Sequence, residues 1–184
     1  MGTHHLILGK TTDFLTGQSL VDTHDERRRQ QLARFLVEEK GYAKNEIQAR
    51  QQMQLQLDKK TGQVFVDFVV HAGDNPLMLI LYRPGSIVSR RRTAVAAARI
   101  FYEKAIARAV VTNAEDAEII DTATGRVTGT GLEAIVSRSD AARVLESQQP
   151  LVLSAQRRQK EKQILFAMEV LTQKECDEYT CQNI

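Results

Sequence analysis

The chain has 184 residues, 42% of them hydrophobic, which suffices for one ordinary core with modest additions but not for two full enzyme domains. Its 25 lysine and arginine residues nearly balance 23 aspartate and glutamate residues, so the net charge of +2 does not by itself indicate a nucleic-acid or membrane partner. No apolar run approaches the roughly 20 residues that cross a bilayer, and the N-terminus lacks the pattern of a secretory signal. We therefore expect one main domain, in the cytoplasm and without a membrane partner.

The first predicted element is a helix that starts at Thr23. Thr23 and Glu26 have the spacing of a capping box, in which each side chain accepts a hydrogen bond from a backbone N–H at the helix start. Gly41 is placed to end the helix in a left-handed conformation. The apolar face of the helix carries Leu32, Phe35 and Leu36. We treat residues 1–21 as an N-terminal tail.

Three strands are predicted after this helix. Apolar residues alternate with glutamine and arginine in the later part of residues 47–57, as in a half-exposed strand. Residues 64–70 and 77–82 are nearly continuous apolar runs joined by a turn at 72–76, and they predict a hairpin of buried strands. Together the three strands form the start of a sheet.

A second helix and further strands are predicted in the next part of the chain. The alanine-rich segment 93–107 has strong helix propensity. Residues 109–112 predict a short strand, and residues 117–121 and 126–128 flank a turn.

Two more helices are expected at the C-terminal end, at 140–146 and 155–171. The second has an apolar stripe formed by Ile164, Leu165, Met168 and Leu171. We expect this stripe to pack back on the sheet or to pair with a second copy of the chain. The two cysteines, Cys176 and Cys181, match no strong metal-binding motif, and we expect reduced thiols, as in a cytoplasmic protein.

This order of elements, a helix, a mixed sheet, a helix and more strands, is the layout of the PD-(D/E)xK nuclease fold. Residues 25–42 look like the opening helix of the type I restriction enzyme R protein N-terminal family. Asp67 and its neighbours are similar to the family's metal-binding strand, and 76–85 sits where the family has a Glu-x-Lys strand ending in Pro-Gly. Tyr102 and residues 110–113 fit the later helix and strand.

The resemblance covers residues 22–135 and implies an α/β fold. We expect a restriction-endonuclease-like domain at 22–138, with a mixed sheet flanked by helices, and a helical C-terminal extension at 139–184. Active members of this superfamily use an aspartate and a glutamate to hold Mg²⁺, and a lysine two residues after the glutamate to act on water near the scissile phosphate.

The positions that match the Glu-x-Lys pair are Leu81 and Arg83. Residues two apart on a strand point to the same face, which is why the family's spacing works. Leucine cannot ligate a hard cation, and arginine stays charged, so it can stabilise a phosphate but cannot act as a base. A glutamine that the family often has in its later helix is replaced by Ala97 or Ala98. The resemblance therefore implies a member that lacks three of the expected polar groups.

Two acidic residues each have more than one possible role. Asp67 lies within an apolar strand, so it must be paired with arginine or lysine, be exposed at a cleft, or bind a metal. Glu26 resembles a helix glutamate that completes the metal site in relatives, but its spacing from Thr23 explains it equally well as a cap residue.

The run Arg90, Arg91 and Arg92 comes just before a predicted helix, where the helix dipole disfavours cations. The unfavourable placement suggests a use in phosphate binding, together with Arg83. The alternative is a solvated cluster paired with acidic neighbours.

Three functions are compatible with these residues. The leading one is a catalytically inactive nuclease-fold protein that needs no cofactor and binds DNA, RNA or a protein partner, with a homodimer as one option. The second is a Mg²⁺-dependent DNA endonuclease that uses Glu26 with Asp67, and Arg83 in place of lysine. The third is a structural or regulatory oligomerisation module that works through its C-terminal helices. Convergence of Asp67, Glu26 and Arg83 in one open pocket would favour the endonuclease, and a filled apolar patch around Leu81 the other two.

Overall fold

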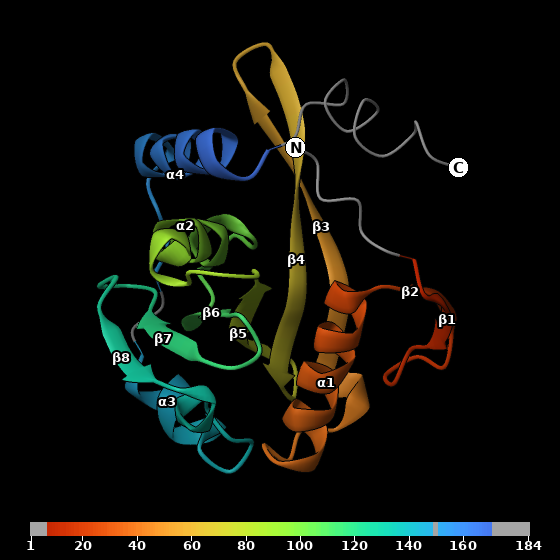
Figure 1. The fold of residues 1–184 in the computed structure, drawn as a ribbon. Helices are drawn as coiled ribbons and strands as arrows, with labels where there is room; N and C mark the ends of the chain where they lie inside the picture. The colour runs from red at the N-terminus through yellow and green to blue at the C-terminus, as the bar shows by residue number, and fades with distance from the viewer. Residues whose placement is uncertain (1–6, 149–150, 171–184) are drawn as a thin grey trace.

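A computed structural model describes residues 7–148 and 151–170 as a six-stranded mixed sheet with helices on both faces, plus a separate two-stranded hairpin (Figure 1). The strands are β1 (Gly9–Thr12), β2 (Ser19–Asp22), β3 (Ile47–Leu57), β4 (Lys60–Ala72), β5 (Asn75–Tyr82), β6 (Arg108–Thr112), β7 (Ala117–Asp121) and β8 (Val127–Thr130). The helices are α1 (His24–Glu38), α2 (Arg91–Ile100), α3 (Ala141–Ser147) and α4 (Ala155–Met168). The α/β class and the mixed sheet predicted from the sequence are confirmed.

The strands lie in the order β3-β4-β5-β6-β7-β8, which is also their order along the chain. β5 and β6 run parallel, and all other neighbouring pairs are antiparallel. A parallel pair needs a crossover connection, and α2 provides it between β5 and β6. The predicted buried hairpin is the β4–β5 pair, whose central strand residues are almost completely shielded from solvent.

The two faces of the sheet carry separate hydrophobic cores. α1 and α3 cover one face, where Leu32 and Leu36 pack with Ile80 of β5. α2 and α4 cover the other face (Figure 1), where Leu79 and Leu81 of the same strand are buried. Alternate residues of β5 therefore point to opposite helical layers, as the period of a strand requires.

The predicted start and end of α1 are confirmed. The Thr23 side chain accepts a hydrogen bond from the Glu26 N–H at 3.1 Å, and Gly41 has a φ of +77° beyond the helix end. Glu26 does not complete the capping box, because its carboxylate instead accepts hydrogen bonds from Gln30 and Arg50. Glu26 is thus turned away from the helix start and toward the sheet.

The alanine-rich helix is shorter than the sequence predicts. The alanine-rich segment predicts a helix to residue 107, but α2 ends at Ile100. β6 starts at Arg108 and runs parallel to β5, so the chain must turn back toward the sheet before that residue. Ile106 and Ala107 lie within the turning segment and are buried, and the Ile106 N–H donates to the Ala98 carbonyl. Tertiary packing of these two residues overrides the local helix propensity.

Segments outside the resemblance contribute to the fold. Residues 9–22, of which 9–21 are predicted as part of a tail, form the β1–β2 hairpin. α3 places Ala141 and Val144 in the first core, and α4 packs against α2 and β3 with Leu165 completely buried. Of the predicted stripe on α4, Met168 is exposed, and Leu171 lies outside the described residues, as do Cys176 and Cys181.

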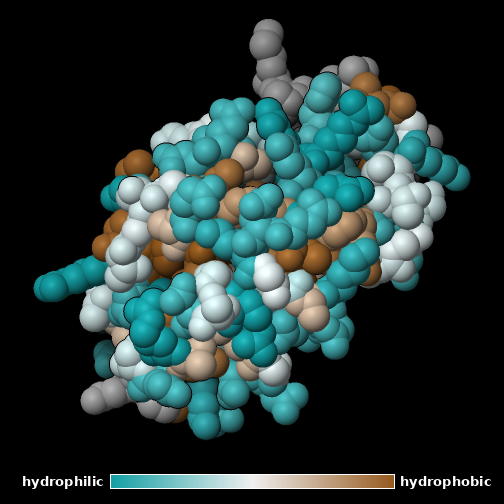
Figure 2. Space-filling model, turned by 90° about the horizontal axis from the view of Figure 1, so that it is seen from below, coloured by the Kyte–Doolittle hydropathy of each residue, from teal (hydrophilic) through white to brown (hydrophobic). Residues whose placement is uncertain are grey.

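The surface has scattered apolar residues. The face shown in Figure 2 is largely hydrophilic, with hydrophobic residues visible in smaller patches between the hydrophilic ones. Within residues 7–148 and 151–170, no helix is long and apolar enough to cross a membrane.

The packing of α4 can be tested at Leu165. We expect Leu165→Ala to lower the free energy of unfolding by about 2–5 kcal/mol, because the substitution leaves a cavity between α2, α4 and the sheet. Urea unfolding measures the change. Met168→Ala on the exposed side of α4 is the matched control, and equal effects of the two substitutions would contradict the docking of α4.

Candidate functional site

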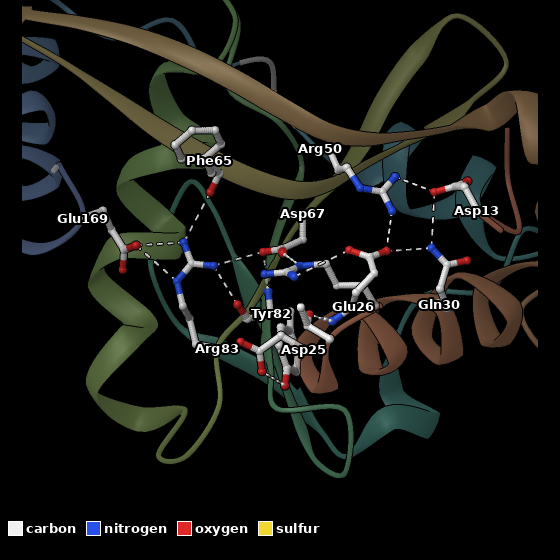
Figure 3. A network of polar contacts seen from close by, with 12 residues as sticks. Asp13, Asp25, Glu26, Gln30, Arg50, Phe65, Asp67, Tyr82, Arg83 and Glu169 are labelled. Atoms are coloured by element: carbon white, nitrogen blue, oxygen red, sulfur yellow. Dashed lines mark hydrogen bonds and ion pairs between the residues drawn. The ribbon is translucent and has the colours of Figure 1, made fainter. Parts of the chain in front are cut away.

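Asp67 on β4 has partners on both carboxylate oxygens (Figure 3). Its Oδ1 accepts from Nε of Arg29 at 2.6 Å. Its Oδ2 accepts from the backbone N–H of Tyr82 at 2.8 Å and from Nη1 of Arg83 at 3.0 Å. A carboxylate that is only 6% exposed within an apolar strand would be costly without such hydrogen-bond donors and cations.

Arg83 lies directly after β5 and joins Asp67 to the end of α4. Its Nε and Nη2 donate to the Glu169 carboxylate at 3.1 and 2.8 Å. Burial opposes the charge of Arg83, but the hydrogen bonds and negative charges of Glu169 and Asp67 outweigh burial and raise the pKa of Arg83 above its ordinary value. The side chain is therefore a permanent cation that cannot take up a proton from water.

Glu26 is held in the same way from the other side. Its carboxylate accepts from Nη2 of Arg50 and from Nε2 of Gln30, the latter at 2.8 Å, and Nη1 of Arg29 lies 3.8 Å away. Arg50 also pairs with Asp13 of the segment between β1 and β2. Burial would raise the pKa of Asp13, but hydrogen bonds from the Thr16 N–H and from Arg50 lower it overall.

These contacts form one continuous network of alternating charges, much of which Figure 3 shows. Its order is Asp13, Arg50, Glu26, Arg29, Asp67, Arg83, Glu169 and Arg90. Four carboxylates face four guanidinium groups, so the formal charges of the network cancel.

The side chain of Leu81 belongs to the apolar core and not to this polar network. It is completely buried in the core beneath α2, together with Leu79 and Val111. Ala97 and Ala98, where relatives often have a glutamine, are buried in the same core. The apolar patch around Leu81 is therefore filled.

A pocket of about 280 Å³ lies beside the network. Its lining includes both acidic candidates, Glu26 and Asp67, together with Arg29 and Arg50. The structure thus places Asp67 and Glu26 in the lining of one pocket. Arg83 contacts Asp67 from outside this pocket.

The residues at this site do not fit a divalent metal ion. Mg²⁺ requires oxygen ligands in near-octahedral geometry. The Asp67 oxygens are engaged by Arg29, Arg83 and a backbone N–H, and Leu81 supplies no oxygen. In the described part of the chain, no group of three or more His, Cys, Asp or Glu residues is placed to hold a metal.

The side chains of Arg90, Arg91 and Arg92 point in different directions and do not line one edge of the sheet. Arg90, the last residue of a 3-10 turn at Val88–Arg90, donates to Glu169 at 3.2 Å and so meets Arg83 there. Arg91 donates through Nε and Nη2 to both carboxylate oxygens of Glu118 on β7. Successive residues of a helix point about 100° apart, which separates these side chains. Arg92 is exposed and has no side-chain hydrogen bond or ion pair to any described residue.

Four members of the network were missed from the sequence: Asp13, Arg29, Arg50 and Glu169. Arg29 follows Glu26 by one helical turn, and this spacing was a usable signal. Arg50 has a φ of +53° and interrupts the β3–β4 ladder, and no sequence pattern predicts this irregularity. Glu169 lies 86 residues from Arg83, so local patterns carry no sign of this pairing.

A family model for the type I restriction enzyme R protein N terminus matches residues 24–135. No curated protein and no solved structure matches the chain significantly. The matched region runs from α1 past β8, and it includes Asp67, Leu81 and Arg83 but neither Asp13 nor Glu169. Because this match spans more than half of the chain, the chain belongs to the family of type I restriction enzyme R protein N-terminal domains.

Proposed function

We propose that this chain is a catalytically inactive nuclease-fold protein that binds the phosphate backbone of nucleic acid. The observation that carries the proposal is the state of Asp67, whose oxygens are taken by Arg29, Arg83 and a backbone N–H. The proposal is also supported by Leu81, which stands in place of the second carboxylate and is completely buried.

Binding of a metal at Asp67 would have to break established ion pairs. Removing one partner of a buried pair leaves an uncompensated charge in a poorly solvated place, which costs several kcal/mol. With Arg83 as a permanent cation in place of the lysine, no group at this position can activate water as a base. Metal-assisted hydrolysis therefore lacks both its ligand set and its base.

A phosphate-binding role is supported by Arg83 and Arg90. Both guanidinium groups donate to the Glu169 carboxylate, and phosphate oxygens accept the same donors in the same geometry. A phosphodiester could therefore take the place of Glu169. Arg92, which is exposed, and Arg91, if it exchanges Glu118 for a phosphate, would contact neighbouring phosphates of the same backbone. Such contacts position a backbone without reading bases, so the binding would not be sequence-specific.

The endonuclease remains the second candidate because Glu26 and Asp67 line one pocket. Against it, we expect the purified chain to leave DNA and RNA intact with Mg²⁺ or Mn²⁺, because the ligand that should accompany Asp67 is a leucine. Gel analysis of plasmid DNA and of a labelled RNA measures this. Metal-dependent cleavage that Asp67→Asn abolishes, with folding verified by melting, would establish the endonuclease instead.

The salt dependence of DNA binding tests the arginines. Each phosphate contact releases counterions and contributes about 0.9 to the slope of log affinity against log salt for duplex DNA. We expect replacement of Arg90, Arg91 and Arg92 by serine to reduce this slope by about two to three, measured by fluorescence anisotropy. The control is the double variant Arg34→Ser, Arg143→Ser, which removes two exposed arginines elsewhere. Absence of binding at low salt, or no effect of the triple substitution, would favour a protein partner.

Glu169 offers a test with the opposite sign. We expect Glu169→Gln to strengthen duplex binding at low salt and to raise the slope by about one, because Arg83 and Arg90 lose a competing carboxylate. Glu38→Gln, on the exposed face of α1, removes the same charge away from these arginines and serves as the control. If the two variants bound DNA with equal affinity, Arg83 and Arg90 would not be part of the DNA-binding surface.

A further inference from the structure

A second pocket lies between α2, α4 and the turn that joins β7 to β8. Its volume is about 250 Å³, and four of its lining residues are arginines: Arg91, Arg92, Arg99 and Arg157. Glu161 is the acidic residue of the lining, and the other lining residues are small or apolar. Neither Asp67 nor Arg83 belongs to this pocket, and α4 lies outside the region that matches the family.

The charges around this pocket do not cancel. Glu161 is almost completely buried and accepts from both Arg99, at 2.9 Å, and Arg157, at 2.8 Å. One carboxylate thus serves two guanidinium groups. Arg91 is neutralised by Glu118, whereas Arg92 has no ion pair with any residue that the structure describes. Two positive charges remain after these pairings.

The pocket also has unused hydrogen-bond donors. A guanidinium group carries five N–H bonds. Arg157 uses only its Nε in the described structure, so both terminal nitrogens remain available, and Arg91 keeps its Nη1. Arg99, in contrast, is engaged by Glu161 and by the carbonyls of Thr122 and Ala123, so it fixes the β7–β8 turn against α2. Arg99 and Glu161 are therefore held in place before any ligand arrives, whereas Arg92 and the terminal nitrogens of Arg157 are available to a ligand.

We propose that this pocket binds a phosphate group that carries two negative charges. A phosphate monoester has a charge of about −1.5 to −2 at neutral pH and three strong acceptor oxygens. Guanidinium groups match these oxygens with paired hydrogen bonds. A single carboxylate would leave one of the two positive charges uncompensated. The group could belong to a free nucleotide or to the phosphorylated end of a nucleic-acid strand.

This site goes beyond the proposed function: it shares Arg91 and Arg92 with the proposed duplex-binding arginines, but it does not need Arg83 or Arg90 and would bind phosphate even without duplex binding. Calorimetric titration of the full chain with inorganic phosphate near neutral pH provides the test. We expect Arg157→Gln and Arg92→Gln each to weaken binding by about tenfold or more, since each removes a hydrogen bond to a charged group. Arg126→Gln is the matched control: this exposed arginine lies in the same β7–β8 connection but does not line the pocket. Arg92 has no partner among the described residues, so its substitution should leave the melting temperature unchanged.

Two further comparisons identify the source of the phosphate. A preference for AMP over adenosine, with equal binding of 5′-phosphorylated and 5′-hydroxyl oligonucleotides, assigns the pocket to a nucleotide. A preference for a 5′-phosphorylated oligonucleotide over its 5′-hydroxyl form, larger than that for AMP over adenosine, assigns it to a strand end. Absence of phosphate binding, or binding by both variants as by the unsubstituted chain, would overturn the proposal. Arg157 is not one of the proposed duplex-binding arginines. The effect of Arg157→Gln on phosphate binding therefore tests the pocket separately from the proposed duplex binding.

Discussion

The structure depends on a carboxylate that is placed inside a sheet. Asp67 lies where β4 and β5 cease to pair, beyond the last matched residues Phe68 and Ile80. Its charge would be costly there without donors. α1 contributes Arg29 and the end of β5 contributes Arg83, so this one buried charge sets how a helix and a strand end meet the sheet.

The network around Asp67 achieves with guanidinium groups what a bound cation achieves in metal-dependent nucleases, the compensation of clustered carboxylates. A metal ion leaves coordination positions for water and substrate, whereas hydrogen-bonded arginines fill the acceptor positions of the carboxylates with donors of the chain itself. The alternation of charges continues through Glu26 and Arg50 to the β1–β2 segment, and through Glu169 to α4. The same ion pairs therefore connect parts of the chain that the hydrophobic cores leave apart.

Sequence reasoning found most of the fold because the strands have distinct apolar runs and α1 has clear signals at both ends. It placed the end of α2 too late, because no glycine or proline marks the turn after Phe101 and only packing on the sheet decides it. At the site, the resemblance pointed to Asp67 and Arg83, which the structure brings into contact. Arg50 and Glu169 were not predicted, because a backbone irregularity and a contact over 86 residues leave no local pattern.

The network also bears on how the chain divides into independent folding units. A fragment restricted to residues 24–135 would retain every strand of the large sheet but would lose Asp13 and Glu169. Arg50 and Arg83 would then each keep only one of their two carboxylates, while Leu165 would vanish from the core over α2. The region that matches the family is thus smaller than the set of residues that neutralises the network, because its ion pairs extend into both flanking segments.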